Sequence, residues 1–370
     1  MKNNIPNIIL LVLLAGIIAF FSLSYAFVNA KSFSEEENRA LQALPRFTAE
    51  KLLDGTYTRQ LHDYYSDQIN LRTLMVELKA SFELLMGKNE NNGILYGQDG
   101  YLIETYPYTE DNYSYLKNNL LKIEKLMSVL EENGIQSNSV LVPRKVDVLK
   151  DYLPPYYSAE RNDAVWELVG NPHISLTDAL KKGDEVFYKT DHHWTAEGAY
   201  IAYRELGELL GYSPKSYSTF DVITLSDSFL GTTYSSSGFF FVSPEEIKAP
   251  NLNADRYKTE IVDIEFTFDG LYDESYLAKK DKYSTFLSGN NAHVRIYDTQ
   301  GESKPTLLII KDSYSHSLVP YLCEHYNIEL IDPRYYTGSI EDYILENDID
   351  RVLFLFGLDT LAGANLSIRK

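Results

Sequence analysis

The chain has 370 residues, and 44% of them are hydrophobic and 13% aromatic, which is enough for a folded core and excludes a disordered protein. Its 53 acidic residues outnumber the 34 Lys and Arg residues, and the formal net charge of -19 would repel a phosphate backbone, so nucleic-acid binding is not expected. A single cysteine, Cys323, excludes an internal disulfide and a cysteine-ligated zinc site.

The N-terminus predicts a membrane anchor. The nearly uninterrupted apolar run Ile8–Val28 would span about 31 Å as a helix, which matches a bilayer core. Lys2 precedes this run and acidic residues 35–37 follow it, so the positive-inside rule places the rest of the chain outside the cytoplasm. We expect residues 1–30 to stay as an anchor; signal cleavage after Ala30 is the alternative and would give a secreted protein.

Residues 31–90 predict a linker followed by an N-terminal helical segment. Apolar residues recur there at helical spacing, and Gly87 can end the helix. The pattern predicts that one face of this helix lies in a core. The residues of this face are Leu71, Leu74, Met75, Leu78, Phe82 and Leu85.

Residues 91–370 alternate between short apolar runs and amphipathic segments. A β-hairpin is expected over 93–103, around the turn-rich residues 97–100. Strands separated by helices predict an α/β fold with a mostly parallel sheet and helices on both faces. The expected helices are 116–130, 164–169, 195–210, 314–323 and 339–346, and the expected strands are 140–143, 186–188, 306–310, 328–331 and 352–356.

Residues 214–303 interrupt this alternation. They are rich in Ser, Asp, Tyr and Phe and show few helical patterns. We interpret them as an insertion built of strands and loops. The many tyrosines of the chain suit a sugar-binding groove, although most of them are expected to be half-buried surface residues.

Two polar motifs follow predicted strands, at the sheet edge where ligands bind in open α/β sheets. Ser313 lies at a strand-to-helix corner, where backbone N–H groups can stabilise an oxyanion. Serine needs an imidazole to take its proton and a carboxylate to orient that imidazole, and Asp191 and His193 offer such a pair. In an extended segment these two share a side while His192 points away, so His193 is the predicted base.

Other interpretations of these residues stay open. A D-x-H sequence at a strand end also occurs as a purely structural hydrogen-bonded pair, and Asp312 with Lys311 fits turn chemistry. His316 is expected to line the pocket. A metal hydrolase using Asp191, His192, His193 and Asp312 is disfavoured, because adjacent histidines on an extended segment point apart. No cofactor or metal is expected.

An ordered set of motifs in this chain resembles the DHHW protein family, which is related to the alginate O-acetylation proteins with SGNH-hydrolase-like domains. The resemblance covers nearly everything after the predicted anchor. The motifs are E-N-R at 37–39, D-H-H-W at 191–194, D-K-Y-S-T-F-L-S-G-N at 281–290, K-D-S-Y-S-H at 311–316 and D-P-R-Y-Y at 332–336.

The resemblance implies an SGNH-hydrolase-like domain over 91–370, circularly permuted, with the insertion at about 214–303. It implies an extracytoplasmic O-acetyltransferase or acetylesterase acting on cell-surface polysaccharide with a Ser313, His193 and Asp191 triad, often beside a membrane-bound O-acyltransferase that supplies acetyl groups. The motif reads Lys-Asp-Ser where Gly-Asp-Ser is the family pattern, and no Gly-x-Asn-Asp block is present for the oxyanion hole. The residues considered for oxyanion or substrate binding are Asn290, Gly289, Arg334, Tyr314 and Trp194; Arg334 equally suits an ion pair with a carboxylate.

The residues and the resemblance are therefore consistent with three functions. The first is an O-acetyltransferase with an acyl-Ser313 intermediate. The second is a carbohydrate acetylesterase with the same triad, since the two differ only in whether sugar or water reaches the acyl-enzyme. The third is a non-catalytic glycan-binding or scaffold subunit of an acetylation complex.

Overall fold

The computed structural model describes residues 5–27, 30–34, 39–69, 71–158, 163–252, 254–300 and 303–369. Val28 and Asn29 of the predicted cleavage site, and Glu37 and Asn38 of the E-N-R motif, lie outside the described residues. The chain divides into two compact units. The first contains Met1–Lys88 with Gly238–Phe240, and the second contains Asn89–Ser237 with Phe241–Lys370.

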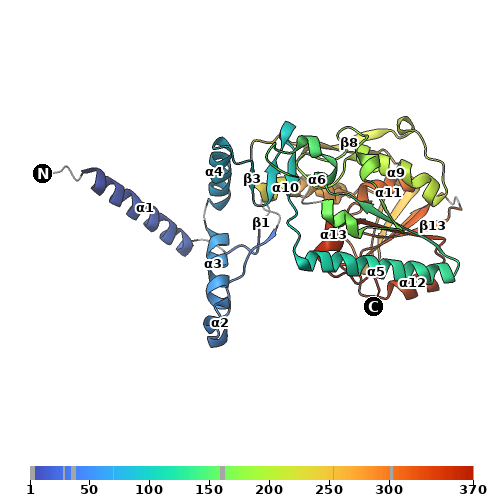
Figure 1. The fold of residues 1–370 in the computed structure, drawn as a ribbon, viewed down its shortest axis with the longest axis horizontal. Helices are drawn as coiled ribbons and strands as arrows, with labels where there is room; N and C mark the ends of the chain where they lie inside the picture. The colour runs from blue at the N-terminus through green and yellow to red at the C-terminus, as the bar shows by residue number, and fades with distance from the viewer. Residues whose placement is uncertain are drawn as a thin grey trace. The chain divides into compact units, whose positions relative to one another are not determined.

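The first unit is mostly helical (Figure 1). No helix among the described residues reaches the length and hydropathy that crossing a bilayer requires. The elements of this unit are α1 (Ile5–Phe27), β1 (Phe33–Ser34), β2 (Arg39–Ala40), α2 (Ala49–Leu53), α3 (Thr56–Gln68) and α4 (Arg72–Leu85).

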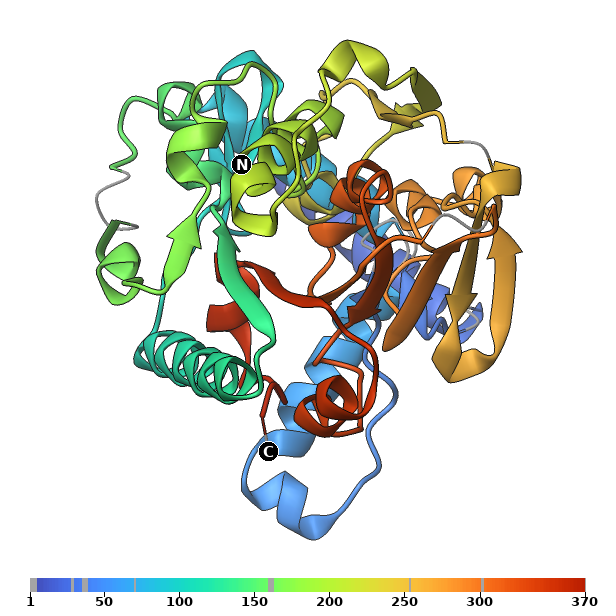
Figure 2. The same cartoon turned by 90° about the vertical axis from the view of Figure 1, so that its right-hand side faces the viewer.

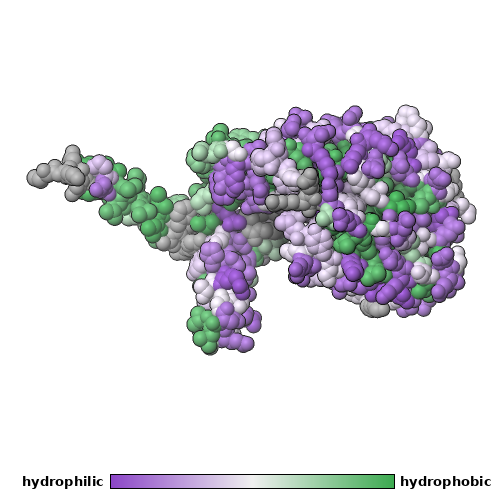
Figure 3. Space-filling model, viewed as in Figure 1, coloured by the Kyte–Doolittle hydropathy of each residue, from purple (hydrophilic) through white to green (hydrophobic). Residues whose placement is uncertain are grey.

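The apolar face of α4 was expected to be core, and this expectation is wrong. Leu74 is 47% exposed, Leu78 56% and Phe82 65%, and hydrophobic residues are visible on the surface of α4 in Figure 3. Only Ala80 of this helix is buried. Helical spacing shows which side of a helix is apolar, but it does not show what covers that side.

The second unit is built on an eight-stranded sheet with the strand order β11-β10-β12-β14-β13-β15-β6-β7. Neighbouring strands from β14 to β7 pair in parallel, and the pairings from β11 to β14 are antiparallel. The strands are β6 (Gln136–Val142), β7 (His173–Ser175), β10 (Tyr257–Ile261), β11 (Phe266–Asp269), β12 (His293–Asp298), β13 (Thr306–Lys311), β14 (Asn327–Ile331) and β15 (Arg351–Gly357).

The α/β class is therefore confirmed, but the sheet is mixed rather than mostly parallel. The three antiparallel strands β10, β11 and β12 come from the region 214–303 that was expected to be an insertion. That region instead extends the central sheet. Its strands are half-polar, so their alternation gave no sign that they join the buried strands.

Two apolar clusters cover the two faces of the sheet. Side chains of β13 alternate between them, so that Leu307 and Ile309 belong to one cluster and Leu308 and Ile310 to the other. The first cluster includes α9 (Ala196–Leu210) and α11 (Ser315–Leu322), and the second includes α5 (Glu110–Glu132), α12 (Ile340–Glu346) and α13 (Leu358–Gly363). Figures 1 and 2 show α9 and α11 on one side of the strands and α5 and α12 on the other, which confirms the prediction of helices on both faces.

Three of the helices that cover the sheet begin at capping residues. Thr195 caps α9 by accepting the amide of Gly198, and Gly211 ends that helix with a positive φ of 80°. Ser339 caps α12, and Thr109 forms a capping box with Asn112 at the start of α5.

The predicted hairpin is also present, because β4 (Ile94–Tyr96) pairs antiparallel with β5 (Leu102–Glu104). The predicted helix near 164–169 is instead the 3-10 helix η3 (Ala164–Leu168). The remaining named elements are β3 (Glu90–Asn91), α6 (Lys145–Val148), α8 (Thr177–Leu180), β8 (Val222–Phe229), α10 (Thr232–Ser237), β9 (Glu245–Pro250) and the 3-10 helices η1 (Gln98–Gly100), η2 (Lys150–Tyr152), η4 (Tyr217–Thr219), η5 (Ala254–Arg256), η6 (Val262–Ile264), η7 (Glu274–Ala278) and η8 (Lys282–Thr285).

Candidate active site

Residues 186–195 form a narrow loop and not the strand that was predicted. The amide of Tyr188 donates to the carbonyl of His193 at 3.1 Å, and the amide of Thr195 donates to the carbonyl of Val186 at 3.0 Å. Between them the chain bends through 189–193, so the alternation of an extended strand does not apply. The ring of His192 therefore does not point away, and its centroid lies 3.9 Å from that of His193.

Ser313 lies at the corner between β13 and α11, as predicted. The preceding residue, Asp312, shapes this corner, because its carboxylate accepts the amide of Tyr314 at 3.0 Å and the amide of Gly357 at 2.7 Å. The second bond ties the corner to the end of β15. Asp312 therefore has the turn role that the sequence suggested.

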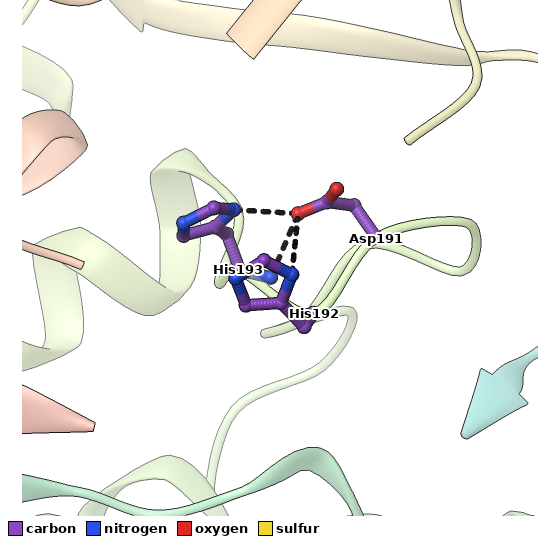
Figure 4. A group of neighbouring side chains, drawn as sticks. All are labelled: Asp191, His192 and His193. Atoms are coloured by element: carbon purple, nitrogen blue, oxygen red, sulfur yellow. Dashed lines mark hydrogen bonds and ion pairs between the residues drawn. The ribbon is translucent and has the colours of Figure 1, made fainter. Parts of the chain in front are cut away.

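The structure brings the three predicted catalytic side chains together. Nε2 of His193 lies 2.7 Å from Oγ of Ser313, and Nδ1 of His193 lies 2.6 Å from Oδ1 of Asp191. Figure 4 shows both histidine rings beside the Asp191 carboxylate. With the Nδ1 proton on the carboxylate side, Nε2 is left to accept the serine hydroxyl proton, which is the arrangement that nucleophilic catalysis by serine requires.

The electrostatics of the site keep His193 neutral and Asp191 ionised. Burial and the neighbouring His192 lower the pKa of His193 to about 4, although Asp191 opposes this shift. Burial alone would raise the pKa of Asp191, but the charges of His192 and His193 and the hydrogen bonds from His193 hold it well below its usual range.

The second oxygen of Asp191 is held by the start of α10. Oδ2 accepts the amide of Thr232 at 2.7 Å and its hydroxyl at 2.9 Å. Gly231 lies so close that a Cβ there would be 2.3 Å from both Cβ and Oδ2 of Asp191. A glycine is needed at this position because a larger residue would push the carboxylate away.

Glu245, at the start of β9, anchors the residues that precede Asp191. Its carboxylate accepts the amide of Lys189 at 2.6 Å, and the amide and hydroxyl of Thr190 at 2.7 and 2.6 Å. Sequence reasoning missed Thr232 and Glu245, because both come from a region without clear periodicity and lie 40 residues or more from the residues that they bind.

Aromatic side chains pack around the histidines. The ring of Tyr283 stacks on His193 with centroids 3.9 Å apart and an 11° angle between the planes, and its hydroxyl lies 3.2 Å from Oγ of Ser317. Trp194 is fully buried and donates its Nε1–H to Ser317. Tyr314 is only 3% exposed, and its hydroxyl donates to the carbonyl of His192. Trp194 and Tyr314 therefore offer little surface to a substrate and support the loop instead.

Asn290 and Gly289, which were considered for binding the oxyanion, do not present a free backbone donor pair at Ser313 in the described residues. Asn290 is exposed, and the amide of Gly289 already donates to the carbonyl of Phe286. The amide of Tyr314 is taken by Asp312, and that of His316 by the carbonyl of Ser313. These amides are therefore engaged within their own turns.

Arg334 and the lysine of the K-D-S motif pair with a buried acid. Arg334 donates to both oxygens of Asp332 at 2.9 and 2.6 Å. Of the two roles suggested for Arg334, substrate binding or an ion pair with a carboxylate, the structure shows the ion pair. Nζ of Lys311 lies 3.4 Å from Oδ2 of Asp332 and 2.8 Å from Nε2 of His316. The lysine that replaces glycine in the motif is therefore accommodated by its own buried partners.

A second Ser-His-carboxylate set occurs at β6 and β7. Oγ of Ser139 lies 2.8 Å from Nδ1 of His173, whose Nε2 lies 3.2 Å from Oε1 of Glu124. Ser139 is fully buried in the sheet, so no substrate can reach its hydroxyl. Ser313 is partly exposed, and this accessibility distinguishes the two sets.

Among the described residues, Asp191, His192 and His193 also form a group of the kind that holds metal ions, with ligand atoms within 4.8 Å of one another. Nε2 of His193 is directed at Ser313 and both oxygens of Asp191 are hydrogen-bonded, so the observed arrangement uses these atoms for a hydrogen-bond chain. A pocket of about 570 Å³ lies elsewhere, lined by residues that include Phe187, Lys189 and Glu245 but not the three catalytic candidates.

Comparisons with known proteins agree with the motifs. The family model described as DHHW protein matches residues 162–331, and the model described as SGNH hydrolase-like domain, acetyltransferase AlgX, matches residues 94–221. The chain is 25% identical over 173 residues to the probable alginate O-acetylase AlgJ of Pseudomonas syringae, which is 42% of this chain and 43% of that protein. The match thus spans less than half the length of this relative.

Two solved structures share the fold. A DHHW family protein from Eubacterium siraeum is 24% identical, with a TM-score of 0.59, over 75% of this chain and 94% of that chain. PatB1 of Bacillus cereus is 20% identical, with a TM-score of 0.60, over 75% of this chain and 98% of that chain. Identities this low support the fold and leave the chemistry to be argued from the site.

Proposed function

This chain carries the signatures of the DHHW protein family and of the AlgX-type SGNH-hydrolase-like domain, and from them we propose that it is an O-acetyltransferase of cell-surface or secreted polysaccharide, acting through an acyl-Ser313 intermediate. The observation that carries the proposal is the hydrogen-bond chain from Oγ of Ser313 through His193 to Asp191, with distances of 2.7 and 2.6 Å.

In the first step His193 takes the hydroxyl proton of Ser313 on Nε2 while Oγ attacks the acetyl carbonyl carbon of the donor. The bond from that carbon to the donor breaks, and the leaving group receives the proton from His193. In the second step His193 takes the proton of a sugar hydroxyl, the sugar oxygen attacks the acyl carbon, and Ser313 leaves and recovers its proton. Asp191 keeps its negative charge throughout and stabilises the imidazolium.

The esterase alternative uses the same residues with water in the second step. The two functions differ in what reaches the acyl-enzyme, so they are separated by a competition experiment. Purified protein is incubated with a small aryl acetate, with and without oligosaccharide. We expect acetylated sugar to form at the expense of free acetate; acetate release that sugar leaves unchanged would favour the esterase.

The decisive variant is Ser313→Ala. We expect it to lose ester cleavage and transfer while its melting temperature stays unchanged, since Ser313 is partly exposed and contributes little packing. Unchanged acetylation of the polysaccharide by cells that carry this variant would contradict the acyl-Ser313 mechanism and favour the non-catalytic glycan-binding or scaffold role. Metal analysis of the active protein tests the metal-hydrolase alternative in the same preparation.

The proposal includes a location outside the cytoplasm and a membrane-bound O-acyltransferase as acetyl supplier. Its support is the apolar run Ile8–Val28 with Lys2 before it. Protease digestion of intact cells tests the location, because a cytoplasmic domain would survive while the membrane is closed.

A further inference from the structure

His192, the first histidine of the D-H-H-W motif, is fixed through its Nδ1 atom, as His193 is. Thr232 donates its single hydroxyl proton to Oδ2 of Asp191, so its oxygen can only accept from Nδ1 of His192, which lies 2.9 Å away. The Nδ1 proton of His192 is therefore fixed, as is that of His193. Both imidazoles are connected to the carboxylate of Asp191 by hydrogen bonds, His193 directly and His192 through Thr232.

This arrangement leaves Nε2 of His192 as the atom available to a ligand. The side chain of His192 is 27% exposed, whereas that of His193 is 6% exposed. Among the described residues no hydrogen bond is recorded for Nε2 of His192. The two rings lie side by side, with centroids 3.9 Å apart and a 36° angle between their planes, so their Nε2 edges are neighbours (Figure 4).

We propose that His192 binds the acceptor, and that Nε2 of His192 hydrogen-bonds the hydroxyl next to the one that is acetylated. The attacking hydroxyl has one proton and gives it to His193, so the contact of His192 must be with another group. A hydroxyl suits both protonation states of the ring, since it donates to neutral Nε2 and accepts from Nε2–H. The acceptor class is thus a sugar with neighbouring free hydroxyls. This inference rests on the proposed function.

Two substitutions of His192 distinguish a role in binding the acceptor from a role in supporting the loop through Thr232. In His192→Asn the side-chain amide occupies the Nδ1 position and can still donate to Thr232, but nothing reaches the Nε2 position. In His192→Gln the amide reaches the Nε2 position and the link to Thr232 is lost. A binding role predicts that the Asn variant is the more defective for transfer, and a merely structural role predicts the reverse order.

The experiment measures acetyl transfer from a small aryl acetate to a panel of methyl hexosides and their monodeoxy analogues. We expect His192→Asn to raise KM for the hexoside about tenfold or more, as loss of one hydrogen bond in a partly buried site does, with a smaller effect on hydrolysis without sugar. His192→Gln should recover most of the loss. His62→Asn, at an exposed position of α3, is the matched control.

The deoxy analogues make the assignment specific. One analogue that lacks the neighbouring hydroxyl should be as poor a substrate for the wild type as the parent sugar is for His192→Asn, and that variant should not distinguish the two sugars. Equal discrimination by the wild type and the variant would overturn the inference, as would hydrolysis that depends on Ser313 without transfer to any hexoside. Loss of the Ser313 dependence itself would instead overturn the proposed function.

Discussion

Glu245 receives two hydrogen bonds from Thr190 on a single carboxylate oxygen, one from the backbone amide at 2.7 Å and one from the hydroxyl at 2.6 Å. Its other oxygen accepts the amide of Lys189 at 2.6 Å. These are the two residues immediately before Asp191. The position of the Asp191 carboxylate therefore depends on a residue 54 positions further along the chain, at the start of β9, which pairs with β8 in a separate two-stranded sheet.

We predict that Glu245→Gln lowers kcat for ester cleavage about 10- to 100-fold. Hydrogen bonds to a charged group are worth about 1.5–3 kcal/mol. In the variant an NH2 group replaces one of the two accepting oxygens, so a donor would face a donor. Glu246→Gln is the control, since Glu246 is half exposed and pairs with Lys248, which is also half exposed. KM for a small ester should change little in either variant. An unchanged kcat in Glu245→Gln would mean that the loop holds its shape without this anchor.

Gly231 gives a second test of how tightly Asp191 is placed. Its missing side chain leaves room for the carboxylate, and a Cβ would lie 2.3 Å from Oδ2. We predict that Gly231→Ala lowers kcat about 100-fold, since a displacement of about 1 Å at the reacting groups costs that much. Gly363→Ala, where a Cβ would meet nothing within 4 Å, should behave as the wild type. Rates are compared on the same aryl acetate, with circular dichroism to show that both variants fold.

The sequence was sufficient for those parts of the site that local patterns specify. Ser313 follows a continuous apolar strand and precedes a helix, so its corner position can be predicted from periodicity alone. The pairing of Asp191 with His193 was also predicted. The direction of His192 was not, because the prediction assumed an extended strand where the chain bends.

Contacts between distant segments were out of reach of the sequence. Thr232, Glu245 and Tyr283 come from a region whose strands alternate polar and apolar residues, and nothing local shows that they meet the D-H-H-W loop. The antiparallel strands β10 to β12 were missed for the same reason. For α4, the apolar spacing correctly gave a helix, but whether Leu78 is covered depends on a neighbour that periodicity cannot show.

We expect the pKa of His193 to set the acidic limit of activity. It is lowered to about 4, chiefly by burial, so the ring stays neutral and able to accept a proton down to that pH. We predict that kcat/KM for the aryl acetate is constant from neutral pH to about 5 and falls below about 4, by about tenfold per pH unit. A midpoint near the ordinary value of 6.5 would contradict the burial of the base in the working enzyme.

The same shift has a consequence for stability. Because the folded pKa of His193 is depressed below the unfolded value of 6.5, protons bind the unfolded chain more readily. Stability is therefore lost as the pH falls from about 6.5 towards 4 and is unaffected by His193 above that range. Urea unfolding at pH 7 and pH 5 measures the difference. His193→Gln should reduce this pH dependence, because it removes one of the groups that must be protonated.

Ser139 and Ser313 both lie within hydrogen-bond distance of a histidine, at 2.8 and 2.7 Å, yet we expect opposite results when each is changed to alanine. Ser139→Ala should keep full ester cleavage, since a hydroxyl buried within the sheet meets no substrate. It should lose about 1–3 kcal/mol of unfolding free energy, because Nδ1 of the buried His173 is left without its partner. Ser313→Ala should lose the chemistry and keep its stability, because Ser313 is partly exposed and water can take the place of its hydroxyl beside His193. Activity assays and urea unfolding of both variants measure this exchange, and loss of ester cleavage in Ser139→Ala with its fold intact would show that accessibility is the wrong criterion for choosing between the two serines.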